Sequence, residues 1–180
     1  MTLLLGLLVS GLLLLPFLLK APETLQRLTH PLKYEDTIRE VSARYDLEPS
    51  LVAAVVYTES RFDPEAVSSQ NAYGLMQILP QTADFISSRS GIEGDYREPR
   101  TNLSMGAWYL DYLEGRYAGR ERLMLAAYNS GEGRVDSWIS EEGFDIERDI
   151  PFEETRNYVE NVLEARDVYA ELYGEDLSGS

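Results

Sequence analysis

The 180-residue sequence contains no cysteine and only one histidine, His30. Without cysteine the chain cannot form thiolate metal sites or Cys-His nucleophiles. A Ser-His-Asp triad or a histidine-bound zinc would have to use His30, which lies in the linker-like stretch LTHPLKY. Asp and Glu therefore remain as the natural groups for proton transfer, and cleavage of a glycosidic bond needs little more than carboxyl groups.

Basic residues are scarce. Lys and Arg total 16 against 31 Asp and Glu, which gives a net charge of −15 and an isoelectric point near 4.4. This charge repels a phosphate backbone and no Arg-rich helix offsets it, so we expect no nucleic-acid partner. Acidic stretches such as SEEGFDIERD lack the alternating oxygen ligands of a calcium loop, and we predict solvated helix surface there. No metal and no cofactor is expected.

Charged residues are also absent from Leu3 to Leu19, a run of about 17 residues at the lower limit for spanning a bilayer. No small-x-small cleavage site follows in LKAPE, so residues 1–20 are predicted as an uncleaved membrane anchor in preference to a removed signal peptide. A buried core helix is the alternative. The positive-inside rule alone would keep the domain cytoplasmic, because Lys20, Arg27 and Lys33 all follow the run. A long domain can translocate despite this bias, and a start codon further upstream would add basic residues.

The rest of the chain is predicted as one all-α domain of six or seven helices. Residues 21–33 are predicted as a linker, residues 34–174 as the domain and residues 175–180 as a disordered tail. Apolar residues recur at helical spacing from Tyr34 onward, and no alternating run is long enough for a sheet. Pro49 suits the first turn of a helix, and Asn102 is predicted as the N-cap of another.

Glu59 is the first candidate for chemistry. It follows Val52, Val55 and Val56 on one side of the apolar helix LVAAVV, so its carboxyl group is expected at the end of a buried face. Desolvation and the negative end of the helix dipole both favour the neutral acid, which predicts a raised pKa. Such a group can act as a general acid. The alternative is that Glu59 reaches solvent at the helix end and has no function.

Two short amide-containing motifs support a binding site. GLMQ places Gly74, where a ligand can approach the backbone, near Gln77, whose amide can donate to and accept from sugar hydroxyls. AAYN adds Tyr128 and Asn129. Each motif alone has a structural explanation, since Met76 is typical of a hydrophobic core and Asn129 of a helix end.

In chain order, ESRFDPEAVSSQNAYGLMQILPQTA, NLSMGAWYLDYL, AAYNSGEGRV and EETRNYVENVL resemble the motifs of the soluble lytic transglycosylase (SLT) catalytic domain, an α-helical relative of the lysozyme fold. The resemblance extends from Leu32 to Tyr173. It implies that Glu59 is the single catalytic acid/base. It departs at Leu79, where some members have methionine, and at Asn71, where many have glycine. The substrate-binding residues that it implies are Ser68, Met76, Gln77, Tyr128, Asn129, Glu154 and Tyr158.

The resemblance further implies a monomeric enzyme that acts on peptidoglycan glycan strands in the cell envelope, at the extracytoplasmic face of the membrane or secreted to the cell wall. Glu59 would cleave the bond between N-acetylmuramic acid and N-acetylglucosamine and form a 1,6-anhydro product. A goose-type hydrolytic muramidase is the nearest alternative and would need Asp63 or Glu65 to hold a water. A catalytically idle glycan-binding module tethered at the membrane is the other.

Overall fold

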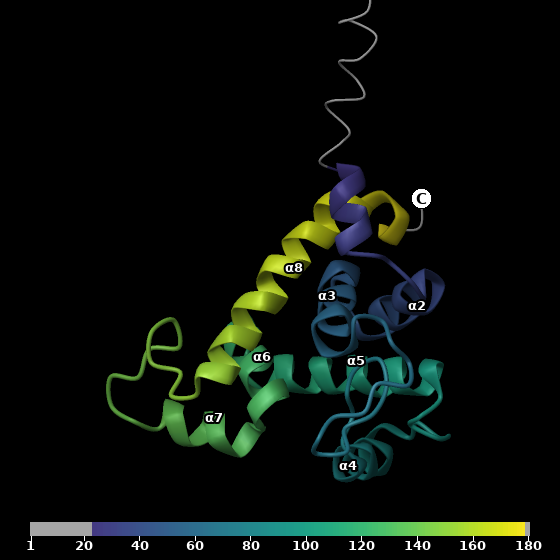
Figure 1. Ribbon diagram of the computed structural model, residues 1–180. Coiled ribbons are helices and arrows are strands. Elements are labelled where there is room, and N and C mark those ends of the chain that lie inside the picture. Colours follow the sequence, from purple (N-terminus) through teal and green to yellow (C-terminus); the bar gives the residue numbers. More distant parts are fainter. Residues whose placement is uncertain (1–22, 179–180) are drawn as a thin grey trace, which may run out of the picture.

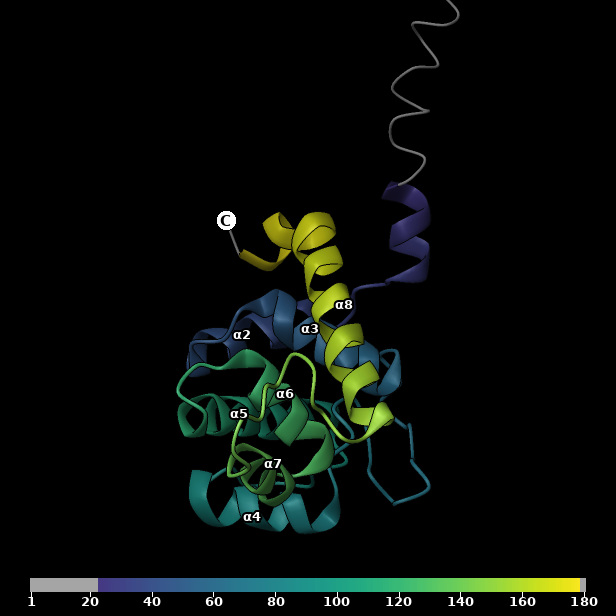
Figure 2. The same cartoon turned by 90° about the vertical axis from the view of Figure 1, so that its left-hand side faces the viewer.

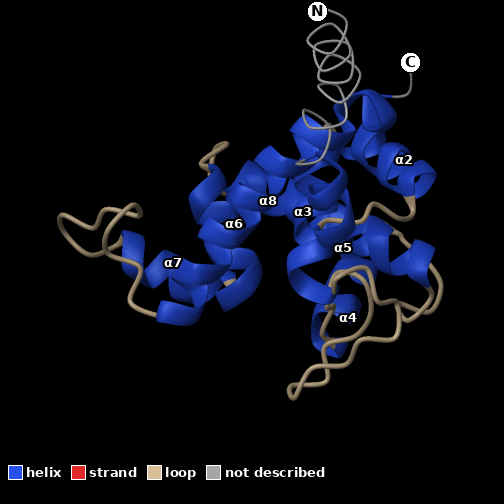
Figure 3. Ribbon diagram, turned by 45° about the horizontal axis from the view of Figure 1, so that its top comes forward, coloured by secondary structure: helices blue, strands red, loops and turns tan. Residues whose placement is uncertain are grey.

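The computed structural model describes residues 23–178; the predicted membrane segment, residues 1–20, lies outside this part. The described chain is helix and loop without a strand, which confirms the all-α prediction (Figures 1 and 3). No helix in residues 23–178 combines the length and apolarity needed to cross a membrane. After a short helix over residues 23–29, the helices are α2 (Glu35–Tyr45), α3 (Pro49–Ser60), α4 (Pro80–Ser90), α5 (Pro99–Arg116), α6 (Glu121–Ser130), α7 (Glu132–Ile139) and α8 (Glu153–Ser178).

Helix α3 forms the centre of the core. Pro49 occupies its first turn as predicted, and every side chain from Leu51 to Val56 is buried. The helix packs chiefly against α8, beside which it lies in both side views (Figures 1 and 2). It ends at Ser60, because Arg61 and Phe62 both adopt positive φ and turn the chain away. Glu59 is thereby held in the last turn of a buried helix.

The loop from Arg61 to Leu79 is fixed by helix α5. Pro99 starts this helix and Glu98 is its N-cap, so Asn102 lies inside the first turns and the N-cap prediction was wrong. The buried Asn102 side chain instead accepts a hydrogen bond from the Met76 amide (2.8 Å) and donates to the carbonyls of Tyr73 and Tyr96 (both 2.9 Å). One amide side chain thus secures the segment that carries the GLMQ motif.

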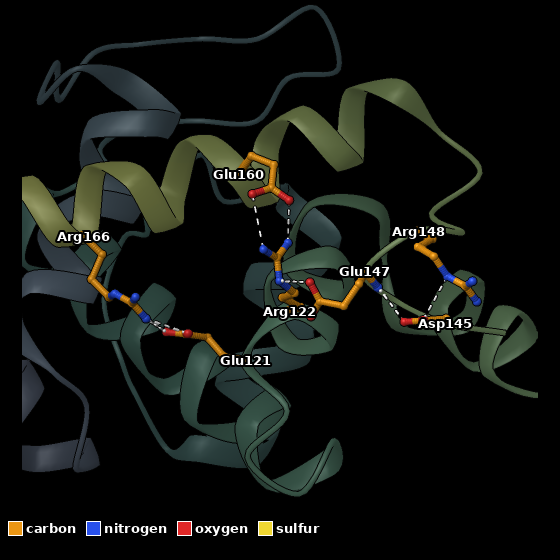
Figure 4. A network of polar contacts seen from close by, with 7 residues as sticks. All are labelled: Glu121, Arg122, Asp145, Glu147, Arg148, Glu160 and Arg166. Carbon is orange, nitrogen blue, oxygen red and sulfur yellow. Dashed lines mark hydrogen bonds and ion pairs between the residues drawn. The ribbon is translucent and has the colours of Figure 1, made fainter.

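The loop between α7 and α8 is held by ion pairs (Figure 4). Arg122, on α6, pairs with Glu147 of this loop (2.8 Å) and with Glu160 of α8 (2.5 Å), while Arg148 pairs with Asp145 inside the loop (3.0 Å). Partly exposed pairs contribute little individually. Arg122, which joins three elements, nevertheless orients the loop that leads into the start of α8.

Both ends of the domain are more ordered than the sequence predicts. Part of the predicted linker is the helix over residues 23–29. The carbonyls of Thr29, His30 and Pro31 accept hydrogen bonds at 2.9 to 3.0 Å from the hydroxyls of Tyr57, Tyr173 and Tyr169, respectively. At the other end, α8 continues past Gly174 to Ser178, so the first residues of the predicted tail are helical. Leu177 is buried there, which explains the extension.

Candidate active site

Glu59 is partly buried, and desolvation raises the pKa of its carboxyl from 4.5 to about 7. The direction agrees with the prediction from sequence. Tyr158, a buried residue of α8, has the opposite and smaller effect through its hydroxyl, which interacts with the carboxyl. Near neutral pH a large fraction of Glu59 therefore carries a proton that it can donate.

Two tyrosines surround this carboxyl. Burial, and secondarily the charge of Glu59, raise the pKa of both Tyr128 and Tyr158 well above the ordinary value, so both remain protonated donors. The Tyr128 hydroxyl donates to the Met76 carbonyl (2.9 Å). The Tyr158 hydroxyl is buried without a hydrogen bond of standard geometry inside residues 23–178, although it is close enough to interact with Glu59. It is thus available to the carboxyl or to a bound ligand.

A cleft of about 890 Å³ lies beside these groups, between the loop after α3 and the facing ends of α6, α7 and α8. Glu59 itself is not among the lining residues, but Tyr128 is, and Tyr128 connects the carboxyl to the cleft. Four of the predicted substrate-binding residues line it: Gln77, Tyr128, Asn129 and Glu154.

The two amide side chains in the cleft have unused hydrogen-bonding groups. Gln77 donates through Nε2 to the carbonyls of Ala66 (3.1 Å) and Gly74 (2.9 Å), which leaves its Oε1 as a free acceptor among the described residues. Asn129 is one residue from the end of α6, and its side chain makes no hydrogen bond to any described residue. Together they offer a ligand an acceptor and a complete amide, which suits hydroxyl and acetamido groups.

The other three predicted binding residues do not line the cleft: Tyr158 is buried beside Glu59, and Met76 and Ser68 lie elsewhere. The Met76 side chain is fully buried against Gly106 of α5, where a Cβ atom would come within 2.2 Å of the Met76 sulfur, so its link to the site is its carbonyl. The Ser68 hydroxyl accepts from the amides of Gln70 (3.2 Å) and Ala72 (3.0 Å) and shapes the loop without reaching Glu59. The structure therefore does not place Met76 or Ser68 on the cleft.

Several lining residues were not selected from the sequence. Tyr109 comes from α5 and contacts Tyr128 ring to ring at 5.6 Å, while Arg134 and Phe152 form the wall at α7 and the start of α8. Arg134 belongs to the quoted motif AAYNSGEGRV, so proximity to Asn129 was an available signal. Phe152 had none, because the loop before it is irregular.

Among the described residues, no second carboxyl group contributes to the environment of Glu59. Asp63 is exposed, and its Oδ1 accepts a hydrogen bond from the Glu65 amide (2.9 Å), as expected for a turn residue before proline. Within residues 23–178 burial and Tyr158 account for the shifted pKa of Glu59, with no contribution from another carboxylate. Among the described residues of the site, Glu59 is thus the carboxyl group with a raised pKa, surrounded by tyrosine and amide groups.

The raised pKa predicts a stability effect that is independent of activity. Between pH 4.5 and about 7 the folded protein keeps a proton that the unfolded chain has lost, so the free energy of unfolding falls as pH rises. This difference corresponds to at most about 3 kcal/mol, and Glu59→Gln removes it. Urea denaturation at each pH gives the free energy of unfolding of the variant minus that of the native protein. This difference should be larger at pH 8 than at pH 4.5, whereas the exposed control Glu141→Gln should show no such change. An equal difference at both pH values would contradict a buried acid.

Two protein-family models match this chain. Residues 36–150 match the model of the transglycosylase SLT domain, and residues 149–177 match the soluble lytic transglycosylase helical domain. The soluble lytic murein transglycosylase of Salmonella typhimurium is 35% identical over 81% of this chain and 24% of its own length. The membrane-bound lytic murein transglycosylase C of Actinobacillus pleuropneumoniae is 32% identical over 78% of this chain and 46% of its own.

Solved structures give the same result. The 70 kDa soluble lytic transglycosylase of Escherichia coli superposes with a TM-score of 0.78 at 31% identity, over 86% of this chain and 27% of the other. An inactive mutant of the lytic transglycosylase Slt of Pseudomonas aeruginosa gives 0.77 at 33% identity, over 82% and 25%. The chain spans about a quarter of the length of these soluble relatives. It has their lysozyme-like helical fold and belongs to the transglycosylase SLT domain family.

Proposed function

We propose that this protein is a peptidoglycan lytic transglycosylase. The observation that carries the proposal is a single partly buried glutamate with a pKa of about 7, beside a cleft with free amide groups, and no other described carboxylate contributes to its shifted pKa. The names of the relatives, soluble and membrane-bound lytic murein transglycosylases, support murein, which is peptidoglycan, as the substrate. A related enzyme has also been solved as a complex with bulgecin A.

In the proposed reaction Glu59 acts twice. It first protonates the glycosidic oxygen between N-acetylmuramic acid and N-acetylglucosamine while the bond from this oxygen to the muramoyl C1 breaks. The C6 hydroxyl oxygen of the same muramoyl residue then bonds to C1, and the Glu59 carboxylate takes the hydroxyl proton. The product is a 1,6-anhydro sugar, the acid is regenerated and no water is consumed. One carboxyl group is therefore sufficient.

The surrounding residues receive roles that fit their contacts. Tyr158 would stabilise the carboxylate between the two proton transfers, because its buried hydroxyl interacts with Glu59 and is otherwise unpaired in the described chain. Gln77 and Asn129 would bind the hydroxyl and acetamido groups of the amino sugars, and Glu154 would close the cleft from α8. Tyr128 would separate the acid from solvent. Met76 would act through its carbonyl and Ser68 through the loop that it shapes.

The cell envelope is the proposed location. Peptidoglycan is extracytoplasmic, and the uncharged run from Leu3 to Leu19 would attach the domain to the membrane. One of the relatives is named membrane-bound, which supports this arrangement.

The products of digestion test the proposal. The full chain, in mild detergent, should release muropeptides from purified peptidoglycan. Mass spectrometry should show that their mass is lower by one water than that of the corresponding reducing muropeptides. Reducing products would indicate a hydrolytic muramidase. A standard glycoside hydrolase needs a second carboxylate, roughly 5 Å from the first in retaining enzymes and roughly 6.5–9.5 Å in inverting ones. Binding without cleavage would indicate a glycan-binding module. Either result would overturn the proposal.

A further inference from the structure

Arg134, on α7, is the only cation among the residues that line the cleft in the described chain. Two anions, Glu153 and Glu154, line the same cleft. The cleft therefore presents one exposed guanidinium group, in a protein whose net charge is −15. A polyanionic substrate would be repelled by most of this surface, so the position of a cation in the cleft affects which ligands can bind.

Arg134 has no carboxylate partner within residues 23–178. Its Nη1 donates to the Ser130 carbonyl at 3.3 Å, and the rest of its hydrogen-bonding capacity is unused by the described residues. Other arginines, such as Arg122 and Arg166, pair with glutamates of neighbouring helices. Neither glutamate in the cleft pairs with Arg134. A guanidinium that remains unpaired beside carboxylates is available to an anion from outside the protein.

Phe152 holds this guanidinium in position. The Arg134 Cζ lies 5.3 Å from the centroid of the Phe152 ring, within the range of a cation-π contact. Phe152 is 47% exposed, although the centroid of its ring lies 5.8 Å from that of Trp138. The Arg122 ion pairs (Figure 4) restrain the α7–α8 loop that leads to Phe152. Arg134 and Phe152 thus form a preorganised site with one charged and one apolar part.

We infer that Arg134 and Phe152 bind a carboxylate of the substrate, an inference that rests on the proposed function. Two groups on a peptidoglycan strand provide this chemistry: the lactyl group of muramic acid, which has a free carboxylate where the peptide is missing, and the stem peptide, whose carboxylates neighbour apolar methyl groups. Bidentate Arg–carboxylate pairing suits both. The site selects strands that carry acid groups over neutral glycans such as chitin.

Three substrates separate these possibilities. They are peptide-bearing strands, strands freed of peptides by an amidase, which exposes lactyl carboxylates, and the same stripped strands after carbodiimide amidation to neutral amides. Cleavage by the full chain and by Arg134→Ala is measured as kcat/KM on each. We expect a loss of about tenfold on a charged substrate, mainly through KM, that shrinks as salt increases. Arg134→Lys should lose less, since the charge remains.

Arg156→Ala is the matched control. Arg156 is exposed on α8, makes no ion pair in the described chain and does not line the cleft, so its kcat/KM should stay within about twofold of native. Urea denaturation of each variant verifies that the protein is folded.

The outcomes are distinct. A loss on peptide-bearing strands alone identifies the stem carboxylate, and a loss on stripped strands alone identifies the lactyl carboxylate. A loss on both charged substrates shows that the site accepts either group. No loss on either, or an equal loss on the amidated strands, overturns the inference. If the native chain cleaves no strand, the proposed function fails separately, and cosedimentation of native and Arg134→Ala protein with the same three strands still tests the site.

Discussion

Glu59→Gln is expected to lower kcat/KM for peptidoglycan cleavage by about 10³-fold, since a positioned acid/base contributes roughly 10² to 10⁴ and no other carboxylate replaces it. The amide has the size of the carboxyl group and can still contact Tyr158, but it cannot give a proton to the glycosidic oxygen or take one from the C6 hydroxyl. Release of soluble muropeptides, followed by chromatography over time, measures the effect.

The matched control is Asp63→Asn. Asp63 is near Glu59 in the sequence and is the residue on which a hydrolytic mechanism would depend, but in the structure it forms a turn. Its substitution should leave kcat/KM within about twofold of native. An equal loss in both variants would indicate a water-activating carboxylate and a hydrolase. A Glu59→Gln protein with more than about a tenth of native activity would show that the proton comes from another group.

The properties of Glu59 were predictable because they follow from local sequence. Glu59, which follows LVAAVV in the last turn of the same helix, lies on the same side as buried valines, and burial alone raises its pKa. The all-α architecture was predictable for the same reason, since apolar periodicity is a local pattern. What the pattern could not supply is the size of the shift, because Tyr158, from the opposite end of the chain, opposes the effect of burial.

Residues whose role depends on distant partners were harder to predict. The family resemblance implies that Met76 and Gln77 share a cleft, but Gly106 on α5 opens a space that takes the Met76 side chain into the core, as the residue type alone suggests. Residues 29–31 look like linker, yet tyrosine hydroxyls from α3 and α8 bind their carbonyls. The cation in the cleft, Arg134, is defined by the absence of a partner, which only the packed structure reveals.

Asn102→Ala is expected to lower the free energy of unfolding by about 3 kcal/mol, although the side chain touches no ligand. The substitution leaves the buried Met76 amide without its acceptor and the Tyr96 carbonyl without its side-chain donor, whereas the Tyr73 carbonyl still accepts from the Ile78 amide (3.0 Å). Each unsatisfied buried group costs roughly 1 to 3 kcal/mol, partly recovered by relaxation. Guanidinium denaturation should show a lower midpoint at an unchanged slope. Asn161→Ala, at an exposed position of α8, should change stability by less than about 0.5 kcal/mol.

The same substitution should also reach the active site through the backbone. The Met76 amide binds Asn102, and the Met76 carbonyl binds the hydroxyl of Tyr128, which lines the cleft beside Glu59. Loosening this segment should lower kcat/KM about tenfold at temperatures where the variant is fully folded, because displaced binding groups orient the substrate less well. Native activity in a destabilised Asn102→Ala protein would show that Tyr128 holds its position without the loop. In that case the amide cluster around Asn102 would serve the fold alone, and the wall of the cleft would depend on α6 and α8.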